Sequence, residues 1–140
     1  MFYLKTLLPS PAIAKTRFSM FLPDTTPQWL ESANGGKGVS SVIIFGIESH
    51  VCVLQTTLDL LSRDIDVHVL ADGISSCNAG ERRLAFERMR QAGAQITTSE
   101  SILFQLLEDA SHPNFKAILT LIMDEKAPTA EAVRVFCEEL

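Results

Sequence analysis

Apolar residues recur along most of the chain with two alternating periodicities. Runs rich in β-branched residues, which predict strands, are followed each time by segments with apolar residues at helical spacing. The strand-like runs are residues 39–46, 66–71 and 94–98, and the helix-like segments are residues 51–63, 79–91 and 99–110. Strands that alternate with helices are typical of βαβ units, in which the strands are parallel. The pattern therefore predicts one α/β domain built on a parallel sheet.

Individual residues indicate where the elements in the first half of the chain begin and end. The run from Val42 to Phe45 is continuously apolar, which is typical of a strand that helices cover on both faces. Upstream of it, Thr26 is a capping residue for a short helix that ends at residues 34–36. Trp29 and Leu30 would be the apolar contacts of that helix.

The C-terminal part predicts three further helices. Ser99 is the expected cap of the helix over residues 99–110. The Ser-His-Pro at residues 111–113 then starts a helix that runs through Met123. The tail at 124–140 predicts a short terminal helix.

Composition narrows the functional classes. With 140 residues and 46% hydrophobic content, the chain is long enough for one domain with one core. The net charge is −5, and the basic residues do not cluster, so no nucleic-acid surface is predicted and small-molecule or protein partners are favoured. No apolar stretch approaches the roughly 20 residues that a membrane helix needs. The three cysteines lack paired spacing, which predicts a reducing compartment such as the cytoplasm. Residues 1–17 are apolar and basic and so resemble an import sequence, which makes the mitochondrion the alternative location.

Cys52 is the first candidate for chemistry. It follows the predicted strand and Gly46, at the start of a predicted helix, where unpaired backbone N–H groups stabilise a thiolate and an oxyanion. The alternative is a buried cysteine that acts as a small hydrophobe. His50 lies only two residues away, a spacing at which helical side chains do not face each other. Cys77 is expected in a turn, and Asp72 is expected to cap a loop rather than line a pocket.

Several ordered blocks of the sequence are similar to one known family. They are AKTRFSM, SVIIFGIESHVCVLQTTLDLLSRDIDVHVLADGISS, RMRQAGAQITTSESILFQL and HPNFKAI. Together they closely resemble the isochorismatase-like hydrolases. The resemblance implies a Rossmann-like, three-layer α/β/α fold around a six-stranded parallel sheet, and an Asp, Lys, Cys triad. It implies hydrolysis of a small amide-like substrate without a cofactor.

The resemblance assigns roles to individual residues. Cys52 would be the nucleophile and Lys15 the lysine of the triad. The peptide bond between Ile47 and Glu48 would be cis, and the backbone N–H groups of Glu48 and Cys52 would form the oxyanion hole. No metal site is expected.

One part of the family pattern is missing. The triad aspartate belongs to a block of a hydrophobic run, Asp, a small residue and Gln, and residues 1–14 contain no acidic residue. We therefore expect a divergent segment at 1–12, a partial domain at 13–123 that lacks its first strand or strands, and a tail at 124–140. The strand at 42–45 would then have a bare, apolar edge.

Two functions remain open at this point. The first is a cysteine hydrolase whose activity is weak or lost because the aspartate is absent. The alternative is a non-catalytic interaction protein that keeps the partial α/β fold and self-associates. Whether the chain is an enzyme is not decided by its sequence.

Overall fold

The computed structural model describes residues 14–137. The first third of this part contains helix α2 (Thr26–Gly36), strand β1 (Ser41–Gly46) and the π-helical turn η1 (Ser49–Val53). The remaining elements are α3 (Leu54–Leu61), β2 (Asp66–Ile74), α4 (Ala79–Gln91), β3 (Gln95–Thr97), α5 (Ser99–Leu107), α6 (Phe115–Asp124) and α7 (Lys126–Cys137). Their order confirms the predicted alternation of strands and helices.

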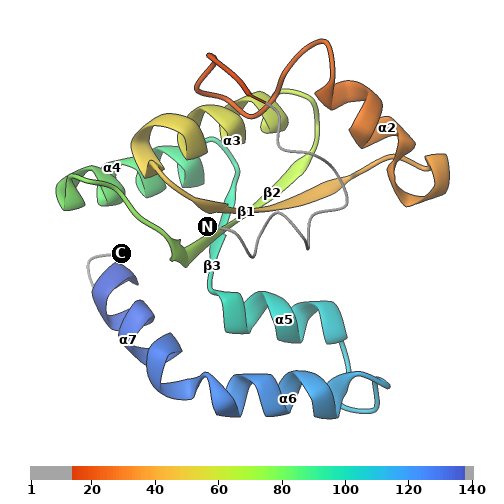
Figure 1. Cartoon of the computed structure of the whole chain (residues 1–140), viewed down its shortest axis with the longest axis vertical. Helices are drawn as coiled ribbons and strands as arrows, with labels where there is room; N and C mark the ends of the chain where they lie inside the picture. Colours follow the sequence, from red (N-terminus) through yellow and green to blue (C-terminus); the bar gives the residue numbers. More distant parts are fainter. Residues whose placement is uncertain (1–13, 138–140) are drawn as a thin grey trace.

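The three described strands form one parallel sheet in the order β1-β2-β3. In its register Val42 lies opposite Val67, and Val69 lies opposite Ile96. Helices α3 and α4 lie on one side of the strands, and α5, α6 and α7 lie on the other (Figure 1). The predicted α/β fold class is therefore confirmed.

The core lies between β2 and helices α3 and α4. β2 is the middle strand, and Val67, Val69 and Ile74 on it are at most 1% exposed. From α4, Phe86 and Met89 are fully buried against the same cluster. A parallel strand covered in this way is expected to be almost continuously apolar.

The expectation that helices cover both faces of β1 is wrong. Side chains along β1 alternate between half-buried and exposed, with Ile43 38% and Phe45 70% exposed. Within residues 14–137, β1 pairs only with β2, so it is an edge strand. Its bare apolar edge agrees with the expectation drawn from the resemblance.

Several local expectations also need correction. Thr98, not Ser99, is the cap of α5, since its hydroxyl accepts from the N–H of Ser101 at 3.3 Å. Trp29 is 48% exposed and is not a core contact, whereas Leu30 packs against the core. The helix expected over 51–63 begins as the π-helical turn η1 and becomes an α-helix only at Leu54.

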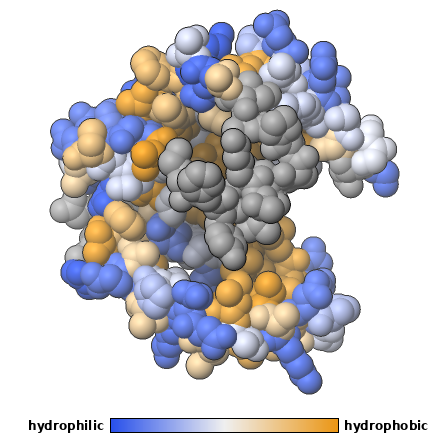
Figure 2. Space-filling view, viewed as in Figure 1, coloured by the Kyte–Doolittle hydropathy of each residue, from blue (hydrophilic) through white to orange (hydrophobic). Residues whose placement is uncertain are grey.

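The C-terminal helices carry little of the core. Neither α6 nor α7 has a fully buried side chain. Figure 2 shows apolar side chains gathered at the surface over α5 and α6. The exposed large apolar residues of these two helices are Phe104, Leu106, Leu119, Leu121 and Met123. No helix in the described part of the chain is long and apolar enough to cross a membrane.

Candidate active site

A sharp turn carries the chain from the end of β1 to Cys52. Gly46 has a φ of +125°, a conformation that favours glycine. The peptide bond between Ile47 and Glu48 is cis, as the resemblance implies. Cys52 then lies within η1, directly after the carboxyl end of a parallel strand. This is the edge of an α/β sheet at which ligands usually bind.

Hydrogen bonds hold this turn against the end of β2. The N–H of Ser49 donates to the carbonyl of Ser75 at 3.0 Å, and the N–H of Ser75 donates to the carbonyl of Gly46 at 3.3 Å. The N–H of Ser49 also donates to the hydroxyl of Ser76 at 3.0 Å. Nδ1 of His50 lies 3.1 Å from that same hydroxyl. His50 therefore helps to anchor the turn and does not pair with Cys52.

Cys52 lines a pocket of about 340 Å³. Its thiol is free and the residue is partly buried. The other walls come from β1, from the start of α3, and from the segment that precedes and enters α2. The lining residues are Met20, Phe21, Thr26, Leu30, Val42, Ile43, Ile44, Phe45, Gly46, Ile47, Cys52, Val53, Thr56 and Leu60.

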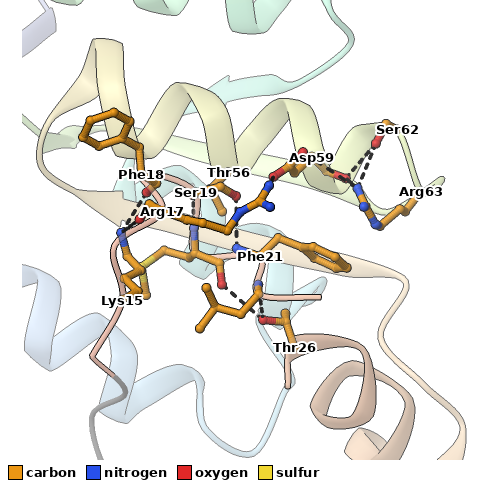
Figure 3. Close-up of polar contacts among 12 residues, drawn as sticks. Lys15, Arg17, Phe18, Ser19, Phe21, Thr26, Thr56, Asp59, Ser62 and Arg63 are labelled. Carbon is orange, nitrogen blue, oxygen red and sulfur yellow. Dashed lines mark hydrogen bonds and ion pairs between the residues drawn. The ribbon is translucent and has the colours of Figure 1, made fainter. Parts of the chain in front are cut away.

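The segment that contains Lys15 lies beside the helix that follows Cys52 (Figure 3). The N–H of Met20 donates to Oγ1 of Thr56 at 2.9 Å, and this hydroxyl donates to the carbonyl of Cys52 at 2.6 Å. Thr56 therefore joins the segment to the turn. Arg17 adds an ion pair with Asp59 at 3.8 Å.

The structure does not join the amine of Lys15 to the sulfur of Cys52. Nζ of Lys15 donates to the carbonyls of Arg17 and Phe18, at 2.7 and 2.8 Å. Lys15 lines a separate hollow that also includes Asp24. The lysine is therefore held by the backbone of its own segment.

The carboxylate that follows β1 and one that lies on β2 bind backbone groups. Oε2 of Glu48 accepts from the N–H of Cys77 at 2.8 Å, and this backbone hydrogen bond is the main cause that lowers the pKa of Glu48 below its ordinary value of 4.5. Asp72 is buried, and its carboxylate accepts from the N–H of Ser99 at 2.9 and 3.0 Å. Asp72 thus fixes the start of α5, which confirms the expectation that it caps a loop.

The other two cysteines have different surroundings. Cys77 is exposed and lies in the turn before α4, where Asn78 caps the helix by accepting from the N–H of Gly80. Cys137 is partly buried at the end of α7, and burial raises the pKa of its thiol above the ordinary value of 9.0. Neither residue lines the pocket of Cys52.

Comparison with known families assigns the chain to one of them. Residues 4–101 match the isochorismatase domain. The match covers more than half of the chain. This chain belongs to the isochorismatase family.

Individual family members agree with this assignment. Isochorismatase family protein 1B of Dictyostelium discoideum is 56% identical over 85 residues, which are 61% of this chain and 41% of that protein. Isochorismatase domain-containing protein 2 of Homo sapiens is 43% identical over 124 residues, or 89% of this chain and 58% of that protein. The chain thus spans about half the length of these relatives.

Solved structures of the family show the same fold. The structure of the MAR1 ribonuclease from Caenorhabditis elegans has a TM-score of 0.74 and 46% identity, and the match covers 83% of this chain and 57% of that one. A putative MAR1 ribonuclease from Leishmania major gives a TM-score of 0.70 at 38% identity. The β1 turn and Cys52 lie within residues 4–101, which match the isochorismatase domain.

Two contacts around the turn of Cys52 were missed by the sequence analysis. Thr56 joins Cys52 to the segment of Lys15, and its spacing of four residues from Cys52 is the signal that a hydroxyl could reach that carbonyl. The bond between the carboxylate of Glu48 and the N–H of Cys77 spans 29 positions. A contact between residues so far apart cannot be predicted from local sequence patterns.

Whether the chain can hold a metal ion is a separate question. Among residues 14–137, no group of three or more His, Cys, Asp or Glu side chains is placed to hold a metal ion.

Proposed function

We propose that Cys52 is the nucleophile of a cysteine hydrolase that acts on a small amide-like substrate. The observation that carries the proposal is that Cys52 lines a pocket beyond the carboxyl end of β1. The sulfur would attack the substrate carbonyl, the C–N bond would break, and the amine would leave with the thiol proton. Water would then hydrolyse the thioester to the acid and restore the thiol. The N–H groups of Glu48 and Cys52 would hold the oxyanion.

The activity of this chain is proposed to be weak. None of the described residues that line the pocket is charged, and the amine of Lys15 is bonded to two backbone carbonyls. In the part of the chain that the structure describes, no charged side chain lines the pocket to take the thiol proton. Loss of such general base assistance lowers a rate by roughly 10²–10⁴-fold.

Hydrolysis of a panel of uncharged amides tests the proposal. We expect slow release of ammonia or amine, abolished by Cys52→Ala and unchanged by Cys77→Ala, whose exposed thiol is the matched control. Lys15→Met should lower the residual rate if the lysine assists. Hydrolysis that survives Cys52→Ala would rule out the assigned nucleophile. Since relatives in the structural comparison bear the name ribonuclease, RNA is a further substrate to assay, although the net charge of −5 opposes RNA binding.

A second candidate function follows from β1. Its free edge exposes Ile43, Phe45 and Ile47, which are 38%, 70% and 68% exposed. An unguarded apolar edge strand is a template for pairing with another chain. The chain would then act as a non-catalytic interaction protein that self-associates. Light scattering over a range of concentrations tests this function, since a monomer at all concentrations would exclude it.

A further inference from the structure

The pocket of Cys52 is lined mainly by apolar residues. Among residues 14–137, the lining residues that are not apolar, apart from Cys52 and Gly46, are Thr26 and Thr56. Both hydroxyls already donate to backbone carbonyls, Thr26 to Met20 at 3.2 Å and Thr56 to Cys52 at 2.6 Å. The side chains around the sulfur therefore offer a ligand mainly apolar contacts, because the hydroxyl protons of both threonines are already donated to backbone carbonyls.

Cationic side chains near this wall face other partners. The guanidinium of Arg63 lies 3.8 Å from the ring centroid of Phe21, which lines the pocket, and pairs with Asp59 at 3.9 Å. The guanidinium of Arg17 pairs with the same Asp59 at 3.8 Å. Nζ of Lys15 is bonded to the carbonyls of its own segment.

The carboxylate before Cys52 is also engaged, since Oε2 of Glu48 accepts from the N–H of Cys77. Among residues 14–137, no charged side chain lines the pocket, so its lining offers no counterion to a charged ligand group that loses its hydration there. Such a transfer is strongly unfavourable.

The position of the pocket adds one polar feature. Four successive residues of β1, Val42 to Phe45, line it although their side chains point alternately to opposite faces. The pocket therefore runs along the strand, on the side that β2 does not occupy. Backbone groups on this side of β1, which have no strand partner within residues 14–137, can bond a neutral amide.

We propose that the Cys52 pocket takes uncharged substrates with an apolar acyl group and rejects both anionic and cationic ones. A volume of about 340 Å³ lies at the low end of small-molecule sites, so the acyl group is short. Phe45, Ile47 and Met20 line the pocket and are 70%, 68% and 59% exposed, which places them at its mouth. The inference rests on the proposed function for the reaction, but the binding preference itself does not require turnover.

Thiol labelling measures this preference directly. Alkyl methanethiosulfonates react with a thiolate to form a mixed disulfide and expel methanesulfinate, so neutral, sulfonate-bearing and trimethylammonium-bearing reagents share one reaction. Peptide mass spectrometry gives the rates at Cys52 and at the exposed Cys77 in the same molecule. Relative to Cys77, we expect both charged reagents to be at least tenfold slower than the butyl reagent at Cys52.

A variant with a new charge sharpens the test. Phe45→Lys should raise the relative rate of the sulfonate reagent at Cys52 several-fold, because it supplies the missing counterion. Leu106→Lys, which changes a residue that is 63% exposed on α5 and outside the pocket, should not. Circular dichroism of both variants checks that they are folded.

The experiments distinguish a failure of the binding inference from a failure of the proposed function. Equal relative rates for all reagents at the two cysteines would overturn the inference. So would a Cys52 that no reagent reaches, or one whose protection rises with protein concentration, since a second copy would then occupy the pocket. Selective labelling without any amide hydrolysis would instead support the inference and count against the proposed function.

Discussion

The two neighbouring strands β1 and β2 differ sharply in their surroundings. Along β2, seven of nine residues are buried, whereas along β1 none is fully buried. β2 has a strand on each side and carries the buried cluster with α4. β1 carries the turn to Cys52 and one wall of its pocket. The interior strand thus contributes its side chains to the buried core, and the edge strand borders the candidate site.

The two strands also differ in how much they contribute to the stability of the fold. Hydrophobic stabilisation follows the apolar area removed from water, so side chains on β2 and α4 contribute more than those on β1. A free edge, in turn, leaves room for a ligand or a partner. The position that gives β1 its candidate function therefore also limits its contribution to stability.

The largest test of this comparison is a pair of Phe→Ala changes. Phe86 is 0% exposed in the core, and its truncation should lower the free energy of unfolding by about 3–5 kcal/mol. Phe45 is 70% exposed, and its truncation should change stability by only about 0.5 kcal/mol. Urea unfolding followed by circular dichroism measures both. Similar losses for the two variants would show that β1 is as well packed as the interior.

A smaller effect is expected where β2 meets α5. Asp72→Ala would leave the partly buried N–H of Ser99 without its acceptor, at a cost of about 1–3 kcal/mol. Asn78→Ala removes the exposed cap of α4 and should cost about 1 kcal/mol. The two variants compare an interior cap with a surface cap in the same unfolding assay. If Asp72→Ala cost less than Asn78→Ala, the interior role of Asp72 would be wrong.

Most of the fold was predictable from local pattern. The periodicity of apolar residues predicted α4 with its observed bounds, 79–91, and located all three strands. β2 extends to Ile74, beyond its predicted end at Ala71, because Ile74 lies opposite Gly46 across an irregular register. A Cβ on Gly73 would lie 3.2 Å from the Cβ of Phe45, so a larger residue there would make a tight contact with β1. Such features depend on the neighbouring strand and not on the sequence around them.

The site was less predictable than the fold. The position of Cys52 after a strand follows from local sequence, and the cis bond before Glu48 came from the family resemblance. The exposure of β1 contradicted the local pattern, since an apolar run reports which residues can be buried and not which strand lies at an edge. The role of Arg82, whose Nη2 donates to the carbonyl of Val135 at 2.9 Å, joins positions 53 apart. Periodicity carries no information on contacts of this kind.

The smallest test concerns the turn at the end of β1. The N–H of Cys77 bonds the ionised carboxylate of Glu48, so the pKa of Glu48 is lower in the folded chain than its ordinary value of 4.5. A depressed folded pKa stabilises the fold at pH values above the unfolded pKa, and this contribution is lost as the pH falls through the folded pKa. Wild type should therefore be slightly more stable than Glu48→Gln at pH 7.

This advantage should fade as the pH falls below the ordinary pKa of 4.5 and through the lower folded pKa, since the carboxyl of Glu48 then becomes protonated in both the folded and the unfolded chain. Urea unfolding of the two proteins at pH 7 and pH 3 measures the change, with Glu31→Gln as an exposed control on α2. NMR titration of the Glu48 carboxyl should give a midpoint below 4.5. A stability difference that stays constant on acidification would mean that the carboxylate does not hold the turn. The turn would then be held against the end of β2 by the hydrogen bonds of Ser49, Ser75 and Ser76.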